Sequence, residues 1–164
     1  MQKIDLTKSK DVIGAYNSID FSYERKTYTD YGTKYCFNVL DGKIVAGYNI
    51  QLACFRHLRD LQRQGDSDFP YVYSVEAFNR FLKFLSLVPN VDDLSQKLEP
   101  MDWQYFIFAQ LFAWFDLDDV PRFSNIIISI ARSQGKTMIA GICLNFSYLI
   151  EIIGQSNQDF LEIG

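Results

Sequence analysis

The sequence predicts an α/β protein in which a mostly helical N-terminal region precedes the first strand, loop and helix of a parallel sheet. Three observations support this prediction. Apolar side chains recur at helical spacing in several stretches before residue 116. Four of the five residues at 126–130 are isoleucine, which is typical of a strand buried on both faces. A Gly-Lys-Thr sequence then opens an apolar stretch that extends from residue 138 to residue 153.

The N-terminal forty residues are predicted to be weakly helical, with a short helix at 11–19 and a turn at Asp41 and Gly42. The helix predicted at 48–64 has stronger support, because its apolar residues recur with i, i+3, i+4 and i+7 spacing. These residues are Ile50, Ala53, Cys54, His57, Leu58 and Leu61. The opposite side carries Arg56, Arg59, Asp60 and Arg63. We interpret that side as a solvated face, and contact with DNA is the alternative.

His57 is the only histidine of the chain and falls at the apolar face of this helix. A lone histidine without a nearby cluster of cysteine or glutamate is a poor metal ligand or general base. We therefore predict that His57 is packed in the core. The three cysteines, at positions 36, 54 and 143, form no Cys-x-x-Cys pair, so the sequence predicts buried thiols in a reducing compartment and no zinc site.

Residues 65–70 are predicted to end this helix, and Ser74 is a plausible N-cap for the next one, at 75–87. The apolar face of that second helix is formed by Phe78, Phe81, Leu82 and Leu85. Residues 91–97 are polar and are interpreted as a connector. We place a boundary there, between a helical N-terminal region at 1–97 and the start of a second domain at 98–164.

A third helix is predicted at 102–115, after Pro100. It is rich in aromatic residues, which are Trp103, Tyr105, Phe106, Phe108, Phe112, Trp114 and Phe115. We interpret this row as core packing, and a surface on which nucleotides stack is the alternative.

Seven residues connect the isoleucine-rich segment to the apolar stretch: Ala131, Arg132, Ser133, Gln134, Gly135, Lys136 and Thr137. Strand, tight loop, Gly-Lys-Thr and helix is the plan of a phosphate-binding loop. Its backbone N–H groups and the helix N-terminus attract a polyphosphate. Gly135 allows close approach of the backbone, Lys136 neutralises the β and γ phosphates, and the hydroxyl of Thr137 can ligate Mg²⁺. The consensus has a glycine where Ile130 stands, and a surface turn with a chance Gly-Lys-Thr is the alternative.

Charge and hydropathy exclude several classes of protein. The formal net charge is −4, which argues against a stand-alone DNA-binding module, although a local basic patch could still contact DNA. The N-terminus lacks the apolar segment of a signal peptide, so we do not expect secretion. No stretch of about 18 uncharged apolar residues occurs, so no membrane span is predicted.

Several motifs, in order, resemble the N-terminal part of the large terminase subunit of tailed bacteriophages, the motor ATPase that pumps viral DNA into the procapsid. The loop at 131–137 resembles the variant Walker A of that family, in which the first glycine is commonly replaced and an arginine stands two positions into the loop. Residues 98–104 are similar to the Leu/Pro/Trp-Gln segment before the ATPase core, with two extra residues between Pro100 and Trp103. Phe112-Ala113-Trp114, Arg122-Phe123 and residues 54–61 resemble further segments of these proteins.

The resemblance implies a P-loop NTPase sheet of the ASCE type, with ATP and Mg²⁺ as cofactors. Lys136 and Arg132 would act in catalysis, Arg132 at the γ-phosphate or at a neighbouring subunit. Thr137 would hold the metal, and Gln104 would hydrogen-bond adenine. The implied partners are double-stranded phage DNA, the portal protein, the small terminase subunit and further copies of the motor in a ring, all in the cytoplasm of a bacterial host.

The family's Walker B carboxylate and its C-terminal nuclease have no counterpart that can be placed in these residues. We therefore expect a fragment with an incomplete parallel sheet and little ATPase turnover of its own. Two alternatives stay open. One is another P-loop NTPase, such as a helicase-like protein, and the other is a non-enzymatic helical interaction module.

Overall fold

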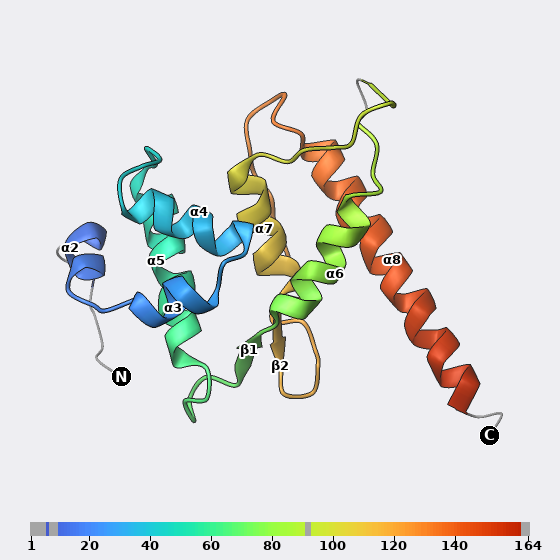
Figure 1. The fold of residues 1–164 in the computed structure, drawn as a ribbon, viewed down its shortest axis with the longest axis horizontal. Helices are drawn as coiled ribbons and strands as arrows, with labels where there is room; N and C mark the ends of the chain where they lie inside the picture. The colour runs from blue at the N-terminus through green and yellow to red at the C-terminus, as the bar shows by residue number, and fades with distance from the viewer. Residues whose placement is uncertain (1–5, 7–9, 91–92, 162–164) are drawn as a thin grey trace. The chain divides into compact units, whose positions relative to one another are not determined.

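The computed structural model describes residue 6 and residues 10–90 and 93–161, and within these it is mostly helical with a small two-stranded antiparallel sheet (Figure 1). The chain forms two compact units. The first comprises Met1–Asn79 and Pro100–Ser124, and the second comprises Arg80–Glu99 and Asn125–Gly164. The division predicted between 1–97 and 98–164 follows the order of motifs and stays a prediction.

The first unit begins with helices α2 (Val12–Asn17), α3 (Ser22–Thr27), α4 (Tyr31–Leu40) and α5 (Tyr48–Arg63). Aspartates cap two of these helices, because the Asp11 carboxylate accepts from the Gly14 N–H and the Asp30 carboxylate accepts from the Thr33 N–H. The predicted turn after α4 is confirmed at Gly42, where φ is +76°. The predicted helix at 48–64 is also confirmed, and it ends before Gly65, where φ is +90°.

Helix α7 (Asp102–Phe112) packs against α4 in the first unit. The rings of Tyr31 and Tyr105 stack with their centroids 4.7 Å apart. Helices α4 and α7 approach each other closely at Gly32, where an added Cβ would lie 2.6 Å from the Ala109 Cβ and 3.2 Å from the Tyr105 carbonyl oxygen. A side chain at position 32 is therefore incompatible with this packing distance.

We expect Gly32→Ala to destabilise the first unit by about 2 kcal/mol, because the new methyl group must push α4 and α7 apart. Urea unfolding monitored by tryptophan fluorescence measures this cost. In an Ala109→Gly background the same substitution should cost less, since the methyl group that it meets is gone. An equal cost in both backgrounds would contradict the close contact.

Strands β1 (Tyr71–Tyr73) and β2 (Trp114–Asp116) form the antiparallel pair, with Tyr71 opposite Asp116 and Tyr73 opposite Trp114 (Figure 1). The predicted helix at 102–115 is therefore too long, because α7 ends at Phe112. The reason is tertiary. The Ala113 carbonyl accepts a hydrogen bond from the Ser74 N–H at 2.7 Å, and pairing with β1 replaces the next helical turn.

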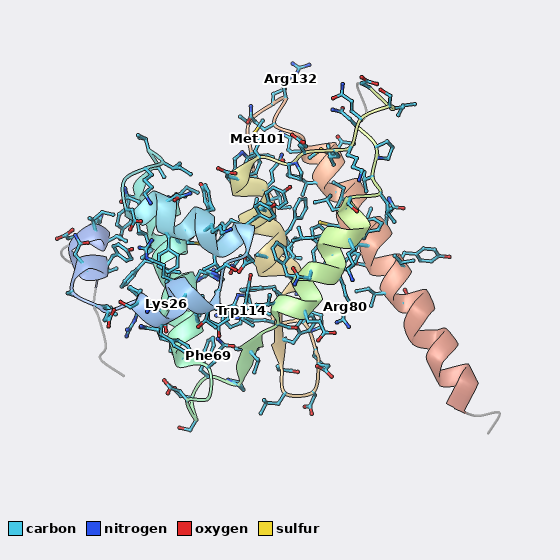
Figure 2. The ribbon with its side chains drawn as sticks, in the orientation of Figure 1. Lys26, Phe69, Arg80, Met101, Trp114 and Arg132 are labelled. Carbon is cyan, nitrogen blue, oxygen red and sulfur yellow. The ribbon has the colours of Figure 1, made fainter. Side chains whose placement is uncertain are left out.

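Trp114 lies at the centre of the core of the first unit, with none of its surface exposed (Figure 2). Its ring meets those of Tyr73, His57 and Phe69 edge-on, at centroid distances of 5.1, 5.8 and 5.9 Å. Phe106 also contacts His57, at 5.9 Å. These contacts confirm the prediction that His57 is a packed core residue and the interpretation of Phe106 and Trp114 as core aromatics.

The solvated face predicted for α5 is wrong at one position. Asp60 is only 4% exposed, and its Oδ2 lies 2.8 Å from Nη1 of Arg122. The contact does not meet the geometry of a hydrogen bond and is an ion pair. Arg56 is exposed as predicted, whereas Ile50 on the predicted apolar face is 43% exposed. A partner far along the chain explains why an aspartate is buried on this side.

Helix α6 (Val75–Leu85) leads from the first unit into the second, where α8 (Lys136–Leu161) is the long element. The predicted N-cap of α6 is confirmed, since the Ala77 N–H donates to Ser74 Oγ at 3.1 Å. Within the second unit, Phe146 of α8 packs against Phe81 and Phe84 with ring centroids 5.0 and 5.3 Å away. In the part of the chain that the structure describes, no helix combines the length and the hydropathy that crossing a membrane requires.

The strand predicted at 126–130 is not formed, because within the described residues this segment pairs with no other strand. Ile126 is 50% exposed and Ile127 is 96% exposed. A strand buried on both faces needs neighbours that supply hydrogen bonds and side-chain cover. The residues at 6, 10–90 and 93–161 provide only the antiparallel β1–β2 pair and no parallel sheet.

Candidate functional site

The loop before α8 has the backbone conformation of a tight, glycine-dependent turn. Ser133 and Gly135 both adopt positive φ, of +62° and +76°. Such residues turn neighbouring N–H groups towards one side, as in anion-binding nests. The helical bond from the Ile139 N–H to the Gly135 carbonyl, at 2.9 Å, follows at once. The N–H groups of residues 136–138 therefore lie in the first turn of α8, where no carbonyl of the helix can accept a hydrogen bond from them.

Lys136 is the first residue of α8, and its side chain folds back over the loop. Its Nζ donates to the carbonyl oxygens of Ile130 at 2.7 Å and Ala131 at 3.3 Å. The side chain remains exposed, so these two carbonyls hold the ammonium at the loop without burying it. A phosphate that entered the loop would meet a full positive charge already close to the turn.

A cavity of about 1030 Å³ lies against this loop within the second unit. Its polar lining comes from Arg132, Ser133, Lys136, Thr137 and Asn145. Its apolar lining comes from Phe84, Leu87, Val88, Pro89, Leu98, Met138, Ile142 and Leu149, with Gly135 and Gly141 between them. The volume is at the upper end for small-molecule sites, and the two kinds of lining suit a ligand with one charged and one apolar part.

The structure brings most of the predicted loop residues together. Five of them line the cavity: Arg132, Ser133, Gly135, Lys136 and Thr137. Arg132 lies at the outer turn of the loop and is exposed (Figure 2). Ala131 and Gln134 are exposed residues of the same loop. Chemically, the loop offers one guanidinium, one ammonium, two hydroxyls and the start of a helix, which is a set of groups that binds oxyanions.

Gln104 belongs to a different compact unit from the loop residues. It belongs to the first unit, where it is 4% exposed, and the loop belongs to the second. Its Oε1 accepts a hydrogen bond from the Met101 N–H at 2.9 Å, which satisfies a free amide at the start of α7. This contact gives Gln104 a structural role, and its predicted contact with adenine stays a prediction.

The apolar lining from residues 84–98 was not predicted as part of a site. The sequence contains one signal for it, because apolar residues continue past the end of α6 as Leu87, Val88 and Pro89. Such residues after a helix can equally cover the helix end. Only the folded chain shows that they share a cavity with the loop.

The chain matches no protein-family model, no curated protein and no solved structure.

Proposed function

We propose that the chain binds ATP with Mg²⁺ through residues 131–137, as the N-terminal part of a DNA-packaging ATPase of the terminase type. One observation carries the proposal. Lys136 and Thr137 begin a long helix directly after Gly135, and all three residues line a cavity large enough for a nucleotide, with the lysine ammonium held at the turn. A surface turn with a chance Gly-Lys-Thr does not require such a cavity.

Each residue of the loop has a role that follows from its chemistry. Lys136 exchanges its carbonyl partners for β- and γ-phosphate oxygens. Arg132 offers a planar fork of donors to the γ-phosphate. The Thr137 side chain is exposed at the cavity, and its hydroxyl suits Mg²⁺, which accepts one protein oxygen while keeping phosphate and water ligands.

We also propose that in an ATPase of this type residues 126–130 join a parallel sheet. Such a sheet would cover Ile126 and Ile127, which are exposed in this structure. A terminase would also have four kinds of partner: double-stranded DNA, the portal protein, the small terminase subunit and further motor subunits in a ring. The order of the motifs in the sequence supports this part of the proposal.

Turnover needs carboxylates that hold Mg²⁺ and orient the attacking water. Among the described residues that line the cavity, none is aspartate or glutamate. We therefore expect the 164 residues to bind ATP and to hydrolyse it very slowly. Rapid hydrolysis by the purified chain would contradict this part of the proposal.

Lys136→Ala tests the phosphate role. We expect the affinity for Mg²⁺–ATP, measured by titration calorimetry, to fall at least ~10-fold, because a hydrogen bond to a charged group contributes about 1.5–3 kcal/mol. Lys83→Ala is the matched control, since Lys83 is an exposed lysine of α6 that does not line the cavity. Undiminished affinity in the Lys136 variant would contradict the proposal. A wild-type chain that does not bind ATP would favour the non-enzymatic helical module.

A further inference from the structure

We propose that the apolar wall formed by Leu87, Val88, Pro89 and Leu98, called the 87–98 wall below, holds the nucleobase and accepts either purine. The inference rests on the proposed function, because it assigns the part of the ligand beyond the phosphates. The four residues line the same cavity as Lys136, and all lie in the second unit.

The cavity has room for a ligand larger than a polyphosphate. The cavity follows α8 from Lys136 to Leu149, a length of roughly 20 Å at the rise of an α-helix. A triphosphate at the loop fills only one end of this space. Gly141 lies part of the way along, and an added Cβ there would meet no atom within 4 Å, so the groove stays open past the loop.

The 87–98 wall is held in shape by its own backbone. The Leu98 N–H donates to the Val88 carbonyl at 3.0 Å, and Pro89 and Lys97 form an antiparallel bridge. The Asn90 N–H also donates to the Gln96 carbonyl, at 2.9 Å. These bonds keep Val88, Pro89 and Leu98 adjacent before any ligand arrives, which lowers the entropic cost of binding.

Further lining residues come from α6 and α8 of the same unit. The C-terminal part of α6 is tied to α8 by the contact of Phe84 with Phe146, at a centroid distance of 5.3 Å. Ile142 of α8, which also lines the cavity, is itself buried. An aromatic base placed here would lie between apolar side chains and would remove them from water.

The chemistry of the 87–98 wall explains why either purine should bind. Its four side chains offer no hydrogen-bond donor or acceptor to the edge of a base. Among the polar lining residues, Asn145 lies farthest along α8 from the loop, and its Nδ2 already donates to the Gly141 carbonyl at 2.7 Å. Affinity then comes from the burial of apolar surface, which adenine and guanine provide about equally.

The experiment measures the binding of Mg²⁺–ATP, Mg²⁺–GTP and Mg²⁺–tripolyphosphate by calorimetry to the full 164-residue chain. We expect ATP and GTP to bind within about threefold of each other and at least ~10-fold tighter than tripolyphosphate. Leu87→Asn should weaken both nucleotides about fivefold and leave tripolyphosphate unchanged. Leu87 is 81% exposed, so this neutral substitution leaves the core intact.

Leu94→Asn is the matched control, because Leu94 is 75% exposed in the same unit and does not line the cavity. It should leave all three affinities unchanged. Tripolyphosphate binding as tight as that of ATP would overturn the base site and leave the phosphate site standing. An ATP preference over GTP above ~10-fold, or an equal loss of all three ligands in Leu87→Asn, would also overturn it. A chain that binds none of the three overturns both proposals.

Discussion

Lowering the pH from about 7.5 to about 4.5 is expected to destabilise the first unit by roughly 3 kcal/mol through His57 alone. Burial, together with the positive charges of Arg56 and Arg122, lowers the pKa of His57 from 6.5 to about 3. The folded state therefore favours the neutral imidazole. Its contribution to stability is fully present above pH 6.5 and is lost progressively as the pH falls towards 3.

The hydrogen bonds of His57 explain why a proton is poorly tolerated. The imidazole is 1% exposed, with Nδ1 2.9 Å from Nε2 of Gln110 and Nε2 3.1 Å from Oγ1 of Thr33. The Gln110 amide nitrogen is a donor, so Nδ1 must accept from it, and Nε2–H donates to Thr33. Protonation of Nδ1 would place two donors opposite each other, inside a ring of aromatic side chains that offers no counter-charge.

Urea unfolding followed by tryptophan fluorescence measures this effect selectively, because both tryptophans, Trp103 and Trp114, lie in the first unit. His57→Gln is the control. It should be less stable than wild type at neutral pH but should lose about 3 kcal/mol less on acidification, since glutamine does not titrate. If the two proteins lose stability in parallel, His57 is not the group responsible.

The elements that sequence reasoning placed well are those whose signals are local. Helix α5 (Tyr48–Arg63) was predicted within one residue at its C-terminus, because its apolar periodicity is long and Gly65 ends it. The start of α8 at Lys136 follows in the same way from Gly135, which takes the positive φ that the turn needs.

The errors concern segments whose structure depends on distant partners. Residues 114 and 115 belong to the helix predicted at 102–115, yet they pair with β1, more than forty residues earlier in the chain. Residues 126–130 have the composition of a buried strand, but composition cannot supply a neighbouring strand. In both cases the presence or absence of a hydrogen-bonding partner decided the outcome.

The candidate site divides in the same way. Its polar half was predictable, because Gly135, Lys136 and Thr137 are contiguous and their order has a physical meaning. Its apolar half was not, because Leu87 and Leu98 reach the loop only through the backbone bonds that close residues 88–98 and through the packing of α6 on α8. The spacing of residues in a sequence does not show that two distant segments line the same cavity.

Asp60→Asn is expected to destabilise the first unit by about 3 kcal/mol, because it leaves the guanidinium of Arg122 without its carboxylate. The two side chains are only 5% and 14% exposed, so water replaces the lost partner poorly. The guanidinium also lies over the rings of Phe69 and Trp114, at 4.9 and 5.2 Å from their centroids. These rings hold the charge in place, and neither can neutralise it.

Asp68→Asn is the matched control for this substitution. Asp68 also faces an arginine, Arg63, at 3.5 Å, but its side chain is 75% exposed, so we expect a change below ~0.5 kcal/mol. A double variant, Asp60→Leu with Arg122→Met, should recover part of the loss, because it removes both charges and fills their space with apolar atoms. Urea unfolding measures all three variants. An Asp60→Asn cost no larger than that of Asp68→Asn would show that burial does not strengthen this ion pair, and stability would then come from the aromatic packing around Arg122 alone.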